Sequence, residues 1–250
     1  MRNARLVALA LALGIVASTL GPRPVVGADE PKLTQQEIEK IVHDYLLREP
    51  EVLGEALRRL QQRQSSAAAQ RAKQAIHDHQ QALLSDQGSP VEGNAQGKVA
   101  IVEFFDYRCV HCRRVASTID NLMRANASVR VIYKNFPVLG EPSVLAARAA
   151  VAAQQQGGWP KLHRAMLAYE GDFTTETLLA LGTSVGLDSA KLKTDMVSPQ
   201  TDKALQANLT LAAALGVDAT PTFVIGERVI RGAPSAEALQ ALVDEEAGKR

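Results

Sequence analysis

The sequence contains only two cysteines among its 250 residues, and both lie in one Cys109-Val110-His111-Cys112 motif. A structural disulfide framework normally uses several cysteines at wide spacings, and one bridge across so short a loop constrains the unfolded chain little. Zinc normally takes four ligands, but no second CxxC motif or paired His-x-x-x-His follows. Haem attachment needs a histidine directly after the second cysteine, and Arg113 stands there. The pair is therefore interpreted as a redox-active dithiol with no resident metal or cofactor, and Cu(I) binding by its soft thiolates stays open.

The chain also lacks an excess of charge and a second long apolar run. Its 28 basic and 27 acidic residues give a net charge of +1, which provides no argument for a nucleic-acid partner. The one apolar run, residues 6–20, follows two arginines and precedes the small residues Val26-Gly27-Ala28. It is shorter than the roughly 20 residues that span a bilayer. Residues 1–28 are therefore predicted to be a cleaved signal peptide, with export to the periplasm.

Residues 29–86 are expected to form a helical stalk. Thr34 and Glu37 fit a capping box, and the apolar residues that follow repeat at helical spacing as far as Leu60. Beyond Leu60 the stretch is rich in Gln, Ala and Arg and has little to bury. Such a thin stripe cannot form a core of its own. Self-association into a homo-oligomer is the preferred interpretation, and a helix folded back onto its own domain is the alternative.

Residues 87–250 predict an α/β domain. The apolar run 99–105 should be a central strand, followed by a helix over 109–124 and a parallel strand over 129–133. A helical insertion is expected over about 140–216, and strands return at 222–225 and 229–231 before a helix capped by Ser235. Strand, CxxC helix, strand, helical block, hairpin and terminal helix is the order of a thioredoxin-like domain with a helical insertion.

Two motifs make this likeness specific. The stretch 104–112, which ends in the CxxC motif, and the later Ala219-Thr220-Pro221-Thr222-Phe223 resemble the DsbA family of thiol-disulfide oxidoreductases over residues 91–246. The segment Arg48-Glu49-Pro50-Glu51-Val52-Leu53 resembles the stalk of ScsC and Com1-like members of that family. The resemblance implies that the stalk drives oligomerisation.

The CxxC motif carries the predicted chemistry. At the start of a helix, Cys109 faces free N–H groups and the positive end of the helix dipole, which favour its thiolate and make it the nucleophile. Cys112, one turn later, should be shielded and act as the resolving thiol. His111 lies between them and could stabilise the thiolate further, as its place in DsbA-type proteins implies. Arg113 and Arg114 either add positive charge near the pair or are ordinary solvated cations.

Three residues outside the motif complete the candidate site. The resemblance implies a cis bond between Thr220 and Pro221 beside the dithiol, with Thr220 tuning redox behaviour. Because proline donates no backbone hydrogen bond, the neighbouring backbone groups are free to bind an extended substrate segment. Glu103 stands in an apolar strand, so its carboxylate is either paired or proton-active. The resemblance implies that Glu103 moves a proton for Cys112; an edge-facing, solvated Glu103 is the alternative.

The sequence therefore predicts a periplasmic thiol-disulfide oxidoreductase, acting as an oxidase or an isomerase. The expected partners are unfolded or misoxidised proteins and a membrane redox partner. His111 favours an oxidising pair, whereas Thr220 and the stalk favour an isomerase. Two interpretations from other classes stay open: a copper-tolerance protein that holds Cu(I) on the dithiol, and a holdase or partner-binding module in which the stalk is the function.

Overall fold

The computed structural model describes residues 33–249, so the predicted signal peptide over residues 1–28 lies outside the described residues. The chain divides into two compact units, Met1–Leu57 and Arg58–Arg250, with the division inside helix α2 (Glu51–Asp78). The expected boundary between stalk and catalytic domain after residue 86 remains a prediction. In the described part of the chain, no helix is both long enough and apolar enough to cross a membrane.

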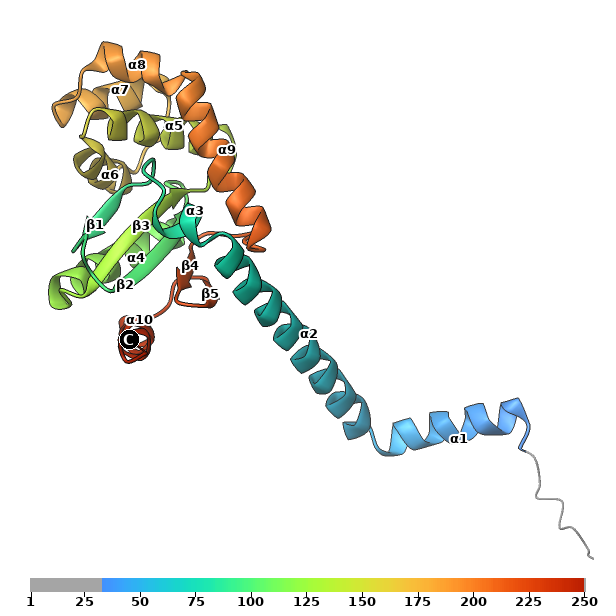
Figure 1. Ribbon diagram of the computed structural model, residues 1–250. Helices are drawn as coiled ribbons and strands as arrows, with labels where there is room; N and C mark the ends of the chain where they lie inside the picture. The colour runs from blue at the N-terminus through green and yellow to red at the C-terminus, as the bar shows by residue number, and fades with distance from the viewer. Residues whose placement is uncertain (1–32, 250) are drawn as a thin grey trace, which may run out of the picture. The chain divides into compact units, whose positions relative to one another are not determined.

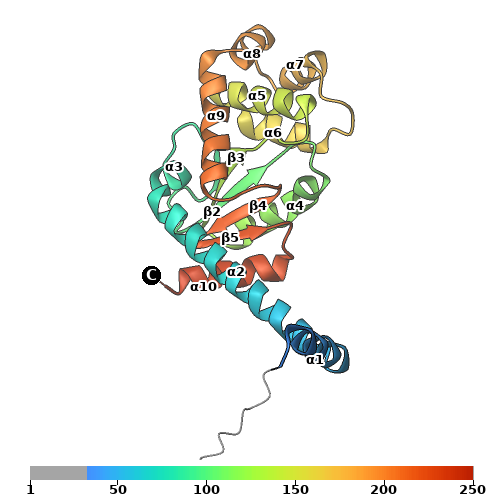
Figure 2. The same cartoon turned by 90° about the vertical axis from the view of Figure 1, so that its right-hand side faces the viewer.

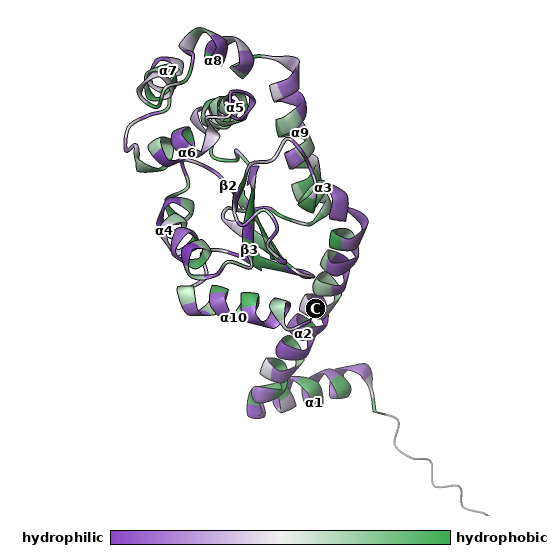
Figure 3. Cartoon of the chain, turned by 60° about the vertical axis from the view of Figure 1, so that its left-hand side comes forward, coloured by the Kyte–Doolittle hydropathy of each residue, from purple (hydrophilic) through white to green (hydrophobic). Residues whose placement is uncertain are grey.

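The first unit holds α1 (Gln35–Arg48) and the beginning of α2. Thr34 and Glu37 form the capping box predicted for α1: the Thr34 hydroxyl accepts from the Glu37 N–H, and the Glu37 carboxylate accepts from the Thr34 N–H at 2.9 Å. No residue of α1 is buried. Its apolar residues, which alternate with polar ones in Figure 3, are exposed, among them Ile38, Ile41 and Tyr45. This unit therefore carries an apolar stripe that nothing in its own described residues covers.

A five-stranded sheet forms the centre of the second unit (Figure 1). The strands run in the order β1-β3-β2-β4-β5. Strands β2 and β3 are parallel, as predicted, and the other three pairings are antiparallel. The strand bounds are β1 Val91–Gly93, β2 Val99–Phe105, β3 Val129–Asn135, β4 Thr222–Ile225 and β5 Arg228–Arg231. This sheet confirms the thioredoxin-like α/β fold.

Helices cover both faces of this sheet because side chains along its strands alternate between the two faces. Ile101 and Phe105 of β2 pack in one core with residues of α4 (Val110–Ala125) and α10 (Ala236–Ala247). Val102 and Phe104 pack in a second core with residues of α9 (Pro199–Ala214), of α3 (Gln80–Leu84) and of the last turn of α2. Glu103 has the same parity as Ile101 and Phe105, so its carboxyl group faces the α4 side.

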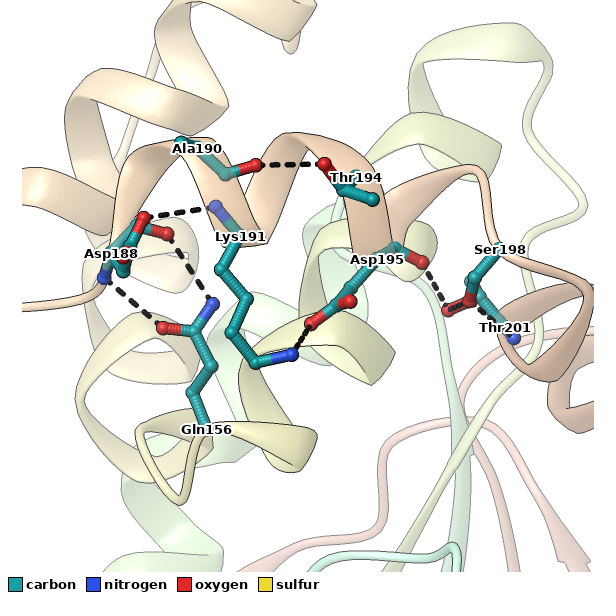
Figure 4. Close-up of polar contacts among 8 residues, drawn as sticks. All are labelled: Gln156, Asp188, Ala190, Lys191, Thr194, Asp195, Ser198 and Thr201. Carbon is teal, nitrogen blue, oxygen red and sulfur yellow. Dashed lines mark hydrogen bonds and ion pairs between the residues drawn. The ribbon is translucent and has the colours of Figure 1, made fainter.

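The helical insertion follows β3 and gathers beyond one end of the sheet (Figures 1 and 2). Side-chain caps begin several of its helices. Asp188 accepts from the Lys191 N–H at 2.9 Å, and Ser198 accepts from the Thr201 N–H at 3.3 Å (Figure 4). Its helices are α5 Glu141–Gln155, α6 Trp159–Ala168, α7 Thr175–Ser184 and α8 Ser189–Met196, followed by α9.

A buried lysine fastens α3 and the following loop to the sheet. Lys134 of β3 is 1% exposed, and its Nζ donates to the Ala82 carbonyl at 2.7 Å, to Asp86 at 3.0 Å and to Ser89 at 2.7 Å. Burial lowers the pKa of Lys134, and the hydrogen bond and the charge of Asp86 oppose that shift. Together with the buried Ile76 and Leu83, these bonds make residues 76–89 an integral part of the second unit.

Candidate active site

Cys109 lies at the junction where β2 gives way to α4. It is the N-cap residue of α4 and makes no side-chain cap hydrogen bond, so its sulfur stands beside N–H groups of the first turn that it does not cap. The Cys109 thiol donates to the carbonyl oxygen of Thr220, with 3.3 Å between sulfur and oxygen. Only 6% of the residue is exposed. A few atoms of Cys109 thus meet solvent, at the place where a substrate sulfur would have to arrive.

The Thr220–Pro221 loop reaches Cys109 because β4 runs antiparallel to β2. Thr222 pairs with Phe104 in the sheet, which brings the residues before β4 to the end of β2. The Thr220–Pro221 peptide bond is cis, as the family resemblance implied. The Pro221 carbonyl accepts from Gly232, whereas the Thr220 N–H has no hydrogen-bond partner within residues 33–249. An unpaired N–H on the residue whose carbonyl meets the Cys109 sulfur can bind an extended peptide backbone.

Asp106 holds the CxxC loop in place. Its carboxylate accepts from the Arg108 N–H at 2.8 Å and, across the loop after β3, from the Val138 and Leu139 N–H groups at 2.9 and 3.2 Å. Its backbone carbonyl accepts from the Cys109 N–H at 3.0 Å. This role of Asp106 was not predicted from the sequence, although Asp side chains commonly form a local turn by accepting a hydrogen bond from the backbone N–H two residues later. Asp106 therefore fixes the approach of Cys109 to α4.

Cys112 and Glu103 meet at a small, partly enclosed cavity behind Cys109. Both residues line a cavity of about 20 Å³ on the α4 side of the sheet. Burial raises the pKa of the Cys112 thiol well above its usual range, and the nearby Glu103 charge raises it further. Burial also raises the pKa of Glu103 to about 8. Glu103 is 3% exposed and has no hydrogen-bond or ion-pair partner in the described part of the chain. The solvated alternative for Glu103 is thus wrong, and an unpaired buried acid remains.

An aromatic cluster that sequence reasoning missed closes the other side of this cavity. His163 of α6 stacks on Trp159 with 4.2 Å between ring centroids, and its Nδ1 hydrogen-bonds the Tyr107 hydroxyl at 2.9 Å. Burial, helped by the nearby Arg164 charge, lowers the pKa of His163 to about 3, so this imidazole is neutral at neutral pH. The signal was available: Trp159 and His163 stand four residues apart on one helix and therefore share a face.

The charged neighbours of the dithiol differ in their surroundings. The Arg113 guanidinium donates to the Leu167 carbonyl at 2.9 Å and to the Tyr169 carbonyl. It therefore fastens α4 to the end of α6 and is half-buried, not free in solvent, whereas the effect of its charge on the thiols stays a prediction. Arg114 is exposed, as the solvated interpretation expected. His111 is exposed and has no hydrogen-bond or ion-pair partner among residues 33–249. The structure brings Cys109, Cys112, Glu103, Thr220 and Pro221 together, and leaves His111 at the rim.

A dithiol at the start of a helix, beside a cis-proline loop on a β1-β3-β2-β4-β5 sheet, defines a thioredoxin-like domain. A family model described as thioredoxin matches residues 85–245. The chain belongs to this family. A second model, described as the copper resistance protein ScsC N-terminal domain, matches residues 35–67. The two matches confirm the predicted likeness to DsbA-type and ScsC-type proteins.

Solved structures agree with this placement. A thioredoxin-like oxidoreductase from Silicibacter pomeroyi is 38% identical, with a TM-score of 0.65 over 68% of this chain and 98% of that one. BcfH from Salmonella enterica Typhimurium is 30% identical, with a TM-score of 0.71 over 84% and 95%. ScsC from Proteus mirabilis, in a transitional conformation, is 29% identical, with a TM-score of 0.67 over 86% and 97%.

Curated relatives divide into two kinds. The first kind is represented by the Na(+)/H(+) antiporter NhaA 3 of Salinispora tropica, which is 26% identical over 155 residues, or 61% of this chain and 24% of that protein. The chain therefore spans about a quarter of the length of this kind of relative. The second kind includes the thiol:disulfide interchange protein DsbA of Bordetella parapertussis, 25% identical over 56% of this chain and 68% of that protein. Both alignments are shorter than this chain, and the solved ScsC and BcfH structures cover more of it.

Proposed function

We propose that this protein is an exported thiol-disulfide oxidoreductase that acts on protein substrates through the Cys109–Cys112 pair. The observation that carries the proposal is the placement of the Cys109 sulfur, 3.3 Å from the Thr220 carbonyl, at the uncapped start of α4. The similarity of this chain to a thiol:disulfide interchange protein and to a thioredoxin-like oxidoreductase supports the same chemistry. A solved relative described as a periplasmic thioredoxin-like protein supports export to the periplasm.

The exchange reaction requires two sulfur centres with different exposure. In the oxidising direction, a substrate thiolate attacks the Cys109 sulfur of the Cys109–Cys112 disulfide. The new bond joins the substrate to Cys109, the old bond breaks, and Cys112 leaves with the electron pair. A second substrate thiolate then releases Cys109, and the substrate gains a disulfide while the protein becomes a dithiol. In isomerisation, the Cys109 thiolate attacks a substrate disulfide, and Cys112 resolves any stalled mixed disulfide.

Glu103 is proposed to carry the proton that Cys112 gains or loses. A buried thiolate is costly, so Cys112 must be protonated when it leaves and deprotonated when it attacks. Because the pKa of Glu103 is raised to about 8, its carboxyl group holds a proton at neutral pH and can take up a new proton after it has donated the first. A group whose pKa lies near the working pH is suited to both tasks. Glu103 thus serves as acid in one direction and as base in the other.

Thr220 and Pro221 are proposed to bind the substrate backbone. The free N–H of Thr220 and its carbonyl, which meets the Cys109 thiol in this structure, lie in the bend that leads into β4. An extended substrate segment can bind these two groups by main-chain hydrogen bonds, and this pairing would place its sulfur beside Cys109. Recognition through the backbone suits a protein that acts on many unfolded sequences. His111, exposed at the rim, is proposed to stabilise the Cys109 thiolate as it forms.

The stalk is proposed to join several copies of the chain. The apolar stripe of α1 is exposed, and covering it with a second copy would remove that surface from water at about 25 cal/mol for each Å². The match of residues 35–67 to the ScsC N-terminal family supports a common role for this segment. Joined copies would hold several dithiols within reach of one misoxidised substrate, which favours isomerisation. A membrane redox partner would set the oxidation state of the dithiol.

Turnover of a disulfide substrate tests this proposal. The wild-type protein should accelerate reduction of insulin by a small thiol and restore activity to a protein with scrambled disulfides. Cys109→Ser should fall to the uncatalysed rate in both assays, and Ser117→Ala, exposed on the same helix, should match the wild type. Full activity of Cys109→Ser would overturn the proposal. The reduction potential, measured against glutathione, then assigns the oxidising or the isomerising direction.

A copper function is the second candidate, favoured by the match of the stalk to a copper resistance protein domain. Two adjacent thiols suit Cu(I), and the described residues form no cluster of three or more His, Cys, Asp or Glu side chains. Cu(I) would therefore be held by the dithiol alone. Competition with a Cu(I) chelator measures this binding. A copper function is favoured over redox exchange if both single Cys→Ser variants lose Cu(I) binding and the wild-type protein does not reduce insulin.

A further inference from the structure

The active-site cavity reaches a second acidic residue that the proposed chemistry leaves unused. Glu92 of β1 pairs with Val131 of β3, and Glu103 of β2 pairs with Tyr133. Val131 and Tyr133 stand two residues apart on β3, so their side chains face the same side of the sheet. Glu92 and Glu103 therefore face the same side, with strand β3 and the Tyr133 side chain between them. Both carboxyl groups line the cavity of about 20 Å³ that also touches Cys112.

The cavity is the size of one water molecule, which needs about 10–15 Å³ of such space and two or more polar partners. Its polar groups supply those partners. The charges of Glu103 and Glu92, and of Asp120 and Arg164, all act on the Tyr133 hydroxyl, and the Tyr133 hydroxyl in turn lowers the pKa of Glu92 by hydrogen bonding. The polar side chains of Glu103, Tyr133 and Glu92 thus line one cavity from the buried acid to the outer strand, and a water in that cavity would complete a polar path between them.

The outer end of this path opens to solvent at a fixed ion pair. The Arg164 guanidinium of α6 donates to the Glu92 carboxylate at 2.6 Å. The Glu92 side chain is 11% exposed and that of Arg164 is 56% exposed, so this pair stands between the cavity and bulk water. Glu103, by contrast, is enclosed, and a proton on it has no direct contact with solvent.

We propose that Glu92, held in place by Arg164, is the outlet through which the proton of Glu103 exchanges with solvent. This inference rests on the proposed function, because the proton in question is the one that Cys112 gives up or takes. When Cys112 attacks, its proton passes to Glu103, then through the cavity to the Glu92 carboxylate, and from there to water. The reverse transfer returns a proton to Glu103. Glu92 acts through Glu103 and touches neither sulfur, so it is a positioning residue for the proton.

The electrostatics of the outlet agree with the geometry. Burial raises the pKa of Glu92 and the Asp120 charge adds to this, whereas Arg164 and the Tyr133 hydroxyl lower it. A carboxyl group balanced in this way exchanges protons more readily than one locked in its ionised form. The only ring nitrogens at the cavity belong to His163, a poor proton acceptor because its pKa is lowered to about 3. The ionisable groups that face the cavity are Glu103 of β2, Tyr133 of β3, Glu92 of β1, Cys112 and Asp120 of α4, and His163 and Arg164 of α6.

The rate at which Glu103 exchanges its proton tests the outlet directly. In the reduced, full-length protein, the infrared carbonyl band of protonated Glu103 is identified as the band that Glu103→Gln removes. A light-triggered pH jump near pH 8 then gives the relaxation rate of that band. Glu92→Gln should slow this relaxation about tenfold, less than the 100-fold or more typical of a direct proton-transfer group because the outlet acts through Glu103. Glu92→Asp should recover part of the rate, since the carboxyl group is retained.

A matched control separates the outlet from a general effect of losing an ion pair. Asp195 of α8 is 13% exposed, accepts from Lys191 at 2.7 Å and lines no wall of the cavity (Figure 4). Asp195→Asn should therefore leave the relaxation rate unchanged. Should Glu92→Gln fail to fold, Arg164→Leu removes the guanidinium that holds the Glu92 carboxylate at the outer end of the cavity, and this loss of positioning should slow the relaxation in the same assay.

Equal relaxation rates in the wild type and in Glu92→Gln would overturn the outlet. A changed equilibrium pKa of Glu103 with an unchanged rate would do the same, because it would reduce Glu92 to an electrostatic neighbour. The measurement needs no substrate, so it is independent of the turnover assays. Absence of insulin reduction in the wild type would defeat the proposed function, whereas normal reduction with equal relaxation rates would defeat the outlet alone.

Discussion

Helices α1 and α4 have the same kind of amphipathic pattern but different surroundings. Ile119 of α4 is 1% exposed, in a core shared with the sheet and α10, whereas Ile41 of α1 is 55% exposed. Ionisable groups differ in the same way: the second unit buries Glu103, His163 and Lys134, and α1 buries none of its residues. A repeat of apolar residues thus predicts a helix and a face, but the structure alone shows whether that face already has its partner.

The largest expected effect is on the pH dependence of stability, and it comes from Glu103, a buried acid of a kind that α1 lacks. Below pH 4.5 the Glu103 carboxyl is neutral in both folded and unfolded chains. Between pH 4.5 and its folded pKa of about 8 the unfolded chain releases the proton and the folded chain keeps it, so stability falls as pH rises and levels off above 8. At 1.36 kcal/mol per pKa unit this loss is about 5 kcal/mol. Urea unfolding from pH 4.5 to 9 should show the loss in the wild type and not in Glu103→Gln.

If the two proteins instead show parallel pH profiles, Glu103 is ionised at neutral pH in the folded state. The proton role proposed for it would then fail. Retention of the wild-type loss in Glu103→Gln would assign the pH dependence to another group whose pKa is raised in the folded chain, such as Glu92.

The second prediction compares the loss of stability caused by truncating Ile119 of α4 with that caused by truncating Ile41 of α1. Ile119→Ala should lower the free energy of unfolding by about 4 kcal/mol, because it leaves a cavity in a closed core. Ile41→Ala should leave the unfolding of the catalytic domain unchanged and should lower the mass seen by light scattering at low concentration. Gln36→Ala, on the opposite face of α1, is the control and should do neither. An unchanged mass for Ile41→Ala and also for Ile41→Asp would contradict an oligomer built on α1.

The third effect tests how firmly residues 76–89 belong to the second unit. Lys134→Met should cost about 3 kcal/mol, since the Ala82 carbonyl and Ser89 lose a buried donor and Asp86 loses its cation. Thermal unfolding followed by circular dichroism measures the cost, and hydrogen exchange of residues 80–89 should rise first. A change below about 0.5 kcal/mol would show that apolar contacts of Ile76 and Leu83 hold this segment without the lysine.

The smallest effect concerns Tyr107, which lies behind the His163 wall of the cavity. Tyr107→Phe removes the hydroxyl that bonds His163 at 2.9 Å and should cost about 1 kcal/mol, with no loss of insulin reduction. Because Trp159 stacks on His163, its fluorescence should change while turnover does not. A large loss of turnover in Tyr107→Phe would make this hydroxyl part of the proton path.

Most of the fold follows from local signals in the sequence. Thr34 and Ser235 cap helices where predicted, and the apolar runs 99–105 and 129–133 become paired parallel strands because both are buried on two faces. Glu103 could be identified as an unusual acid because nothing else in its strand is charged. These features depend on residues close together in the chain.

The remaining part of the site depends on contacts between distant segments. Arg113 binds carbonyls 54 and 56 residues away, and the partner of Tyr107 lies 56 residues away on α6. The pairing of Glu92 with Arg164 spans 72 residues. No local pattern encodes such separations, so the anchoring of Arg113 to α6 and the far wall of the cavity were missed. The helical insertion that supplies this wall could be predicted, but its orientation over the sheet could not.

The central claim is that Cys109 attacks and Cys112 resolves. The intact mass of Cys112→Ser after incubation with a disulfide-bonded protein tests it most directly. We predict one covalent substrate adduct for each chain, attached at Cys109, stable until a reducing thiol is added, and absent in wild type because Cys112 releases it. No adduct in Cys112→Ser, or an adduct that also forms in Cys109→Ser at Cys112, would contradict the assignment.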